Sequence, residues 1–203
     1  MKRGTFVLLT FVFVILVIFM NGCGAYNNMV NGREEVRKTW QNVETFYQLR
    51  IDKIPNLVAT VQGQGDFEKS TLEAVINARA SATKVTVDPT KLDAASLQQY
   101  EQAQGALSSA LGRLLVVSEN YPNLQTNSAF TELRAEISET ENRIQVARSD
   151  YNNKAADFNA MIQRFPRNIW AGVFGFSPFP YFQADQGADK APKVNFNFKD
   201  SAK

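Results

Sequence analysis

Three pieces of sequence decide the fold: Tyr26-Asn-Asn-Met-Val30, Trp40-Gln-Asn-Val-Glu44 and Ile51-Asp-Lys-Ile-Pro-Asn-Leu-Val58. Across and beyond them, the larger residues recur at a mean step of about 3.6, the repeat of an α-helix. They are Val36, Trp40, Val43, Tyr47, Ile51, Ile54, Val58 and Val61. The spacing predicts one long helix with a single apolar stripe. We interpret Pro55 as a kink in this helix, because the stripe continues in phase after it; two separate helices are the alternative.

Three more segments have helical patterns and can cover that stripe. The second helix runs to about Lys84, the third starts near Asp93, and the fourth follows Asn127. In the fourth, the larger residues from Phe130 to Phe165 recur every 3.5 residues or so, the coiled-coil period. Short connections fold such helices back antiparallel. The sequence therefore predicts an all-α fold, an elongated antiparallel bundle of about four helices, two of them long. A freestanding coiled-coil dimer is the competing interpretation.

Composition divides the 203 residues into an anchor (1–23), a helical bundle (24–165) and an aromatic tail rich in Gly and Pro (166–203). The anchor has a basic start and an apolar run from Thr5 to Met20, which suits either an export signal or a transmembrane helix. Met20-Asn-Gly-Cys23 resembles a loose bacterial lipobox, in which Cys23 would be lipidated. The alternative is an uncleaved transmembrane helix with an incidental cysteine. Either anchor tethers the bundle, and the basic start favours its export.

The tail contains an uncharged stretch, residues 168–184, with six aromatic side chains. We interpret it either as a cap over one end of the bundle or as an interaction patch at an interface or a partner protein. The aromatic residues are Trp170, Phe174, Phe176, Phe179, Tyr181 and Phe182. Further on, residues 191–198 alternate apolar and polar like a short strand. We expect the end of the tail to be disordered.

Charge and composition exclude several classes of function. Residues 24–203 are electrically neutral and lack the basic stripe of a nucleic-acid binder. The chain has no histidine, which excludes histidine-based catalysis and histidine metal ligands, and one cysteine allows no internal disulfide. We therefore expect no metal, no cofactor and no nucleic-acid partner.

Charged residues near the helix seams suit structural pairing better than catalysis. Glu44, Arg50, Glu141 and Arg148 are candidates for interhelical pairs that set the register, as flanking charges do in coiled coils. Asn56, Asn142 and Asn152 either mark register near the core or face water. Serines and threonines have no histidine or evident lysine partner to activate them. The sequence thus predicts a protein that is not an enzyme.

Several motifs together resemble bacterial LemA proteins. The likeness extends from about Tyr26 to Phe198, and it implies a membrane-associated, exported or surface-displayed helical bundle without an established enzymatic activity. The motifs are Tyr26-Asn-Asn-Met-Val30, Val36-x-x-x-Trp40-x-x-Val43-Glu44, Arg50-Ile-Asp-Lys-Ile-Pro-Asn-Leu-Val58, Ala78-Arg79, Tyr121-Pro-Asn-Leu124, Glu141-Asn-Arg-Ile144, Ala147-Arg148-x-x-Tyr151-Asn152 and the segment from Gly175 to Phe182.

These observations favour a membrane-tethered scaffold or adaptor of the bacterial envelope that presents its bundle face and aromatic tail to a partner protein. A binding protein for a lipid or small apolar ligand is the alternative, with a dry cavity between the second helix and the glycines Gly105 and Gly112. An enzyme would need a cleft with buried carboxylates. The oligomeric state and the identity of any partner stay open.

Overall fold

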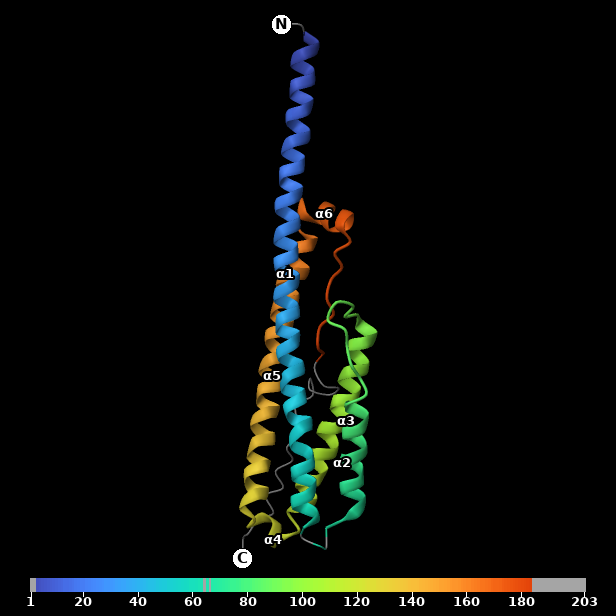
Figure 1. Ribbon diagram of the computed structural model, residues 1–203, viewed down its shortest axis with the longest axis vertical. Coiled ribbons are helices and arrows are strands. Elements are labelled where there is room, and N and C mark those ends of the chain that lie inside the picture. Colours follow the sequence, from blue (N-terminus) through green and yellow to red (C-terminus); the bar gives the residue numbers. More distant parts are fainter. Residues whose placement is uncertain (1–2, 64, 66, 184–203) are drawn as a thin grey trace, which may run out of the picture.

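The computed structural model describes residues 3–63, 65 and 67–183, and within those ranges every regular element is a helix. α1 pairs with α5 and α2 pairs with α3, which gives an elongated bundle (Figure 1). The prediction of an all-α bundle is confirmed. The helices are α1 (Arg3–Gln62), α2 (Lys69–Ala82), α3 (Ala94–Ser118), α4 (Pro122–Gln125), α5 (Ser128–Gln163) and α6 (Arg167–Phe174).

α1 is one continuous helix of 60 residues, so at 1.5 Å per residue it is about 90 Å long. It passes through Pro55 without ending, as the in-phase stripe predicted, and all eight residues of that stripe are buried. It also passes through residue 23 without a joint between anchor and bundle. Its N-terminal part projects alone beyond the other helices (Figure 1). A window of 18 residues there has a mean hydropathy of 2.7, which is long and apolar enough to cross a membrane.

Two clusters of buried side chains lie along the bundle. The distal core, farther from the free end of α1, is built by helix-on-helix packing and includes Ile54, Leu107, Leu114 and Ile137. The proximal core, closer to that free end, contains Trp40, Tyr100, Tyr151, Phe158 and Phe182. The stripe of α1 and the 3.5-residue repeat of the fourth predicted helix contain the members that come from α1 and α5. Phe182 comes instead from the tail.

One predicted helix boundary agrees with the structure, and another differs from it. The α3 start matches the sequence expectation, since the Asp93 carboxylate accepts a 2.8 Å hydrogen bond from the Ser96 N–H. The stripe of α5 ends earlier than predicted. Ile162 is buried, but Phe165 lies past the helix and is 80% exposed, because the chain turns away at Pro166 before Phe165 can reach the core.

The tail is more regular than its Gly and Pro content indicated. It begins with α6, which ends at Gly175 in the left-handed conformation (φ 72°). The Phe176 N–H then donates to the Ala171 carbonyl at 2.9 Å, so the helix closes with a six-residue turn typical of glycine. This turn sends the chain back along the bundle. The strand predicted at 191–198 and the disorder predicted at the chain end lie outside the described residues.

Candidate functional site

The tail returns along the proximal half of the bundle in an extended conformation. Residues 176–183 follow α6 and run down beside α3 and the loop before it (Figure 1). Extended backbone has unpaired N–H and C=O groups, which must find partners where they are buried. Here most of the partners are side chains of α5, and Glu101 of α3 supplies another.

Two asparagines of α5 hold the tail by its backbone. The Asn159 side chain donates to the Phe179 carbonyl at 2.8 Å and accepts from the Phe179 N–H at 2.8 Å. Asn152 makes the same pair of bonds with Phe182, at 3.0 and 2.9 Å. Each amide thus bonds one residue of the tail as a neighbouring β-strand would. We call these two side chains the asparagine clamp.

The spacing of the clamp fits the spacing of an extended chain. Asn152 and Asn159 are seven residues apart, which is about 10.5 Å along a helix. Phe179 and Phe182 are three residues apart, which is about 10 Å along an extended segment. Because the two lengths agree, both bidentate contacts form without distorting either element.

Side chains of the tail complete the proximal core. The Phe182 ring is 6% exposed and stacks on Trp40, with centroids 5.8 Å apart, and it meets Tyr151 edge-on. The Tyr151 hydroxyl donates to the Pro180 carbonyl at 2.9 Å, and burial raises the pKa of this phenol. Phe179 packs edge-on against Phe158. The tail is therefore a structural part of the bundle.

The described tail ends at an ion pair between α3 and α5. Arg148 Nη2 lies 3.3 Å from Glu101 Oε1 and donates to the Gln183 carbonyl at 2.9 Å. The Gln183 N–H donates to Glu101 at 3.3 Å. The Arg148 guanidinium also lies over the Phe182 ring, 4.9 Å from its centroid. These two charged side chains bond the backbone of Gln183 from both sides.

A buried arginine joins three helices directly below that point. Arg50 of α1 is fully buried, and its Nη1 donates to Glu141 of α5 at 2.8 Å and to Ser108 of α3 at 2.6 Å. Its Nη2 donates to the Gln104 side chain at 2.7 Å. Tyr47 lies against the guanidinium, 5.0 Å away. Several hydrogen bonds are needed to offset the desolvation of a buried cation, and this arrangement supplies them.

A cleft of about 440 Å³ opens between α3 and α5 beside this network. The Glu101–Arg148 pair stands at its edge, so the cleft continues from the point where the described tail ends. Most of its lining is polar, and its residues include Gln104, Gly105, Ser108, Glu141, Gln145 and Arg148. Nothing lies within 4 Å of where a side chain on Gly105 would start.

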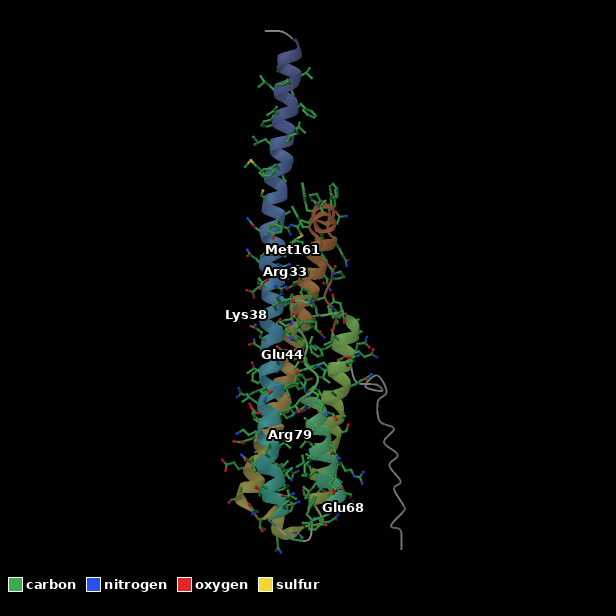
Figure 2. All side chains as sticks on the ribbon, turned by 45° about the vertical axis from the view of Figure 1, so that its right-hand side comes forward. Arg33, Lys38, Glu44, Glu68, Arg79 and Met161 are labelled. Atoms are coloured by element: carbon green, nitrogen blue, oxygen red, sulfur yellow. The ribbon has the colours of Figure 1, made fainter. Side chains whose placement is uncertain are left out.

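The structure divides the residues predicted as pairing sites. Arg50 bonds to Glu141, and Arg148 bonds to Glu101, a residue that the sequence did not single out. Glu44 lies apart from these pairs, on the same helix as Arg50, and partial burial raises the pKa of its carboxyl. Figure 2 labels Glu44 below Lys38, which belongs to the same helix.

The six aromatic residues of the predicted interaction patch differ in how far they are buried. Phe182 is buried, and Trp170, Phe176 and Phe179 are half-buried. Phe174 and Tyr181 keep 42% and 44% of their surface exposed. Cys23, the predicted lipidation site, is exposed on α1. Among the described residues, acidic and cysteine side chains form no cluster suited to a metal ion.

Comparison with known proteins gives the family. The LemA family model matches residues 39–196. The chain belongs to the LemA family. Magnetosome proteins MamQ 1 and MamQ 2 of Paramagnetospirillum magneticum are each 27% identical to it over 182 residues. The match covers 81% of this chain and 66% of each MamQ protein, so the chain spans slightly less than two thirds of their length.

A second relative bears the family's name. Protein LemA of Metamycoplasma hominis is 23% identical over 181 residues, which cover 89% of this chain and 79% of that protein. Membership of the LemA family and the apolar part of α1 together indicate a membrane-associated bacterial protein. The LemA-like motifs quoted above contain much of the site, since they include Arg50, Glu141, Arg148, Tyr151 and Asn152.

Asn159 and Glu101 are functional candidates that the sequence did not single out. Asparagines seven residues apart on the apolar side of a long helix are a usable signal, because such side chains need hydrogen-bond partners when buried. Asn152 was a candidate for a register marker near the core. It lies at the core edge, and its partner is the tail backbone.

Proposed function

We propose that this LemA-family protein is a non-enzymatic, membrane-tethered adaptor of the bacterial envelope that holds an extended segment of a partner protein in the cleft between α3 and α5. The asparagine clamp is the observation that carries this proposal. It supports the proposal because the bundle already binds one extended segment, its own tail, next to the cleft.

The clamp suits a general receptor for extended chains. Side-chain amides bond the N–H and C=O of the bound segment, and these groups are the same in every residue except proline. Neighbouring apolar positions then select side chains, as Trp40 and Tyr151 do for Phe182. Proteins that bind an extended peptide as an additional β-strand work in the same way: backbone hydrogen bonds give affinity, and side-chain pockets give specificity.

The cleft offers the same chemistry below the tail. Ser109 and Gln145 provide an exposed hydroxyl and an exposed amide along a path that continues from Gln183, while Gln104 and Ser108 in the same lining bond to Arg50. Glu101 and Arg148 at its edge bond a backbone N–H and a backbone carbonyl. A partner segment of a few residues fits a space of about 440 Å³. The aromatic residues of the tail that stay exposed, Phe174 and Tyr181, would border the complex.

The polar lining disfavours the alternative of a lipid or small apolar ligand. Gly105 borders this polar cleft instead of a dry cavity, and Gly112 is exposed. The carboxylate closest to the buried network, Glu141, is bonded to Arg50 and Ser108, which supports a structural role for it.

We also propose that the bundle lies on the exported side of the membrane, as the basic N-terminal residues favour. Lipidation at Cys23 and a retained transmembrane helix both fit this proposal. Intact mass spectrometry of the membrane-extracted protein, beside Cys23→Ala, separates them. A shortened, acylated mass that the variant loses indicates a lipoprotein, and an unmodified full-length mass in both indicates a retained helix.

Two glycines on α3 allow a matched test of the cleft. Gly105 lines the cleft, whereas Gly112 lies two turns further along the same helix. At both positions, an added Cβ would have no neighbouring atom within 4 Å. Gly105→Trp should therefore fill the cleft, and Gly112→Trp should serve as the folded control. A photo-crosslinking residue at Gln145, in cells that make the full-length protein, reports what occupies the cleft.

The expected result is crosslinking of Gln145 to one recurrent extended segment of an envelope protein, mapped by mass spectrometry. Gly105→Trp should abolish this adduct, and Gly112→Trp should preserve it. The proposal fails if the adducts are the same in both variants, or if a crosslinker at Asp150, an exposed residue elsewhere on α5, captures the same segment.

A further inference from the structure

Three large apolar residues on and just before α6 are exposed. Phe165 is 80%, Ile169 55% and Val173 67% exposed, and they follow one another at intervals of four residues. This spacing places Ile169 and Val173 on one face of α6, and Phe165 stands just before the helix begins. A contiguous apolar face on a short helix usually marks a contact with a membrane or another protein.

A neighbouring face of α6, formed by Trp170 and Phe174, is fixed to α1. The Trp170 ring lies against Gly22 so closely that a Cβ on this glycine would be 2.9 Å from it. Trp170 also stacks on Phe174, which meets Tyr26 of α1 edge-on at 5.0 Å. Figure 1 shows α6 lying across the end of the bundle where α1 emerges alone. These contacts leave α6 little freedom to turn its apolar face inward.

α6 packs on α1 at the position where the apolar segment of α1 ends. Gly22 is two residues after Met20, the last residue of the uninterrupted apolar run. A membrane that holds this segment therefore has its surface beside α6. Figure 2 shows side chains of α6 extending past the end of the bundle, along the free part of α1. Lipidation at Cys23 would put the membrane surface at the same level.

We propose that α6 is a second membrane contact, which lies in the interfacial layer of the bilayer with Phe165, Ile169 and Val173 immersed. Tryptophan and tyrosine favour this layer, and Trp170 and Tyr26 lie at the same level. Arg164 and Arg167 flank the face and suit anionic headgroups. Helices that lie along a membrane surface bind it through burial of their apolar face together with electrostatic attraction to anionic lipids.

Two contacts, α1 and α6, would fix the orientation of the bundle where one anchor would let it swing. The proposal also places the cleft. Arg50 is 28 residues after Gly22, so the Arg50 network would lie roughly 40 Å from the membrane surface if α1 stays close to the membrane normal. This inference is independent of the peptide-binding proposal, because α6 and the cleft share no residue.

The test uses the full-length protein in lipid vesicles, with Cys23→Ser to remove the native thiol and keep the apolar segment. A single cysteine at Val173 or Ile169 carries an environment-sensitive fluorophore. The control is Ser149→Cys, an exposed position on α5 within the bundle. Vesicles contain phosphatidylcholine and phosphatidylglycerol, with and without lipids that carry a nitroxide quencher.

We expect a blue-shifted emission and strong quenching by the nitroxide lipids at 173 and 169, and neither effect at 149. Equal, water-like signals at all three positions would overturn the proposal. A blue shift that depends on the number of protein copies per vesicle, with no quenching by the labelled lipid, would also overturn it and assign the face to a second copy of the chain.

Discussion

The proximal and distal halves of the bundle cover the apolar stripes of α1 and α5 with different kinds of structure. In the distal core, α2 and α3 pack against the α1/α5 pair, and apolar side chains such as Leu107 and Ile137 meet directly. In the proximal core, an extended tail occupies the space beside α5, and backbone hydrogen bonds accompany each apolar contact. The difference shows that the proximal half of the bundle holds an extended segment of its own chain by the backbone.

The Arg50 network lies where the two halves meet and should give the largest effect. Glu141→Leu leaves a fully buried guanidinium without its carboxylate, and we expect a loss of about 3 to 5 kcal/mol in the free energy of unfolding. Denaturant unfolding followed by circular dichroism measures it.

The control is Glu136→Leu, which breaks the half-exposed pair with Lys53 and should cost less than about 1 kcal/mol. Adding Arg50→Met to Glu141→Leu should restore most of the stability, because no unpaired charge then remains buried. Equal losses from the Glu141 and Glu136 variants would contradict the role assigned to Arg50.

The tail contributes to the proximal core through Phe182. Phe182→Ala should cost about 3 kcal/mol, since it removes a buried ring from Trp40 and Tyr151. Tyr181→Ala, one residue earlier and half-exposed, should cost about 1 kcal/mol or less. Thermal unfolding monitored by circular dichroism compares the two. If the two variants were equally stable, the tail would not be part of the core.

The open space beside α3 predicts a modest gain in stability. Gly105→Ala adds a methyl group that meets nothing within 4 Å and removes a flexible residue from the helix, so we expect a gain of up to about 1 kcal/mol. Gly112→Ala should give the same gain. A loss at Gly105 alone would mean that α5 or the tail closes over the cleft in solution.

Glu44 should give the smallest effect, and it depends on pH. Burial raises the pKa of this carboxyl in the folded protein, so the charged form is less favourable there than in the unfolded chain. The contribution of this carboxyl to the stability of the folded protein is fully present below its unfolded pKa of about 4.5. That contribution is lost as pH rises through the folded pKa. Glu44→Gln should therefore slightly raise the unfolding midpoint at pH 7, with no gain at pH 4. A gain at both pH values would exclude the carboxyl as the cause.

The long helices were predictable because their signal is local. The stripe from Val36 to Val61 repeats every turn, and each of its residues is buried. Arg50 is different, because its full burial depends on where Gln104 and Ser108 of α3 pass, and no local pattern contains that information. A charged residue beside an apolar stripe predicts a pair but not the depth of burial.

The path of the tail was not predictable for the same reason. The Asn152 bond to Phe182 joins residues 30 apart, and the tail has no repeating pattern that marks its partner. α6 did carry a signal, since Pro166 precedes it and Gly175 ends it. The glycine and aromatic content of the segment favoured an irregular structure, and packing of Trp170 on Gly22 outweighed that local preference.

Amide hydrogen exchange at Phe179 and Phe182, measured in the full-length membrane-bound protein, tests the central claim most directly. We expect both amides to be protected, and Asn152→Ala together with Asn159→Ala to increase their exchange about tenfold or more. Asn153→Ala, an exposed neighbour on α5, should leave the exchange unchanged. If both amides exchange at the rate of an unfolded chain in the wild type, or if the clamp variants have no effect, the tail is not held by its backbone and the receptor account is wrong.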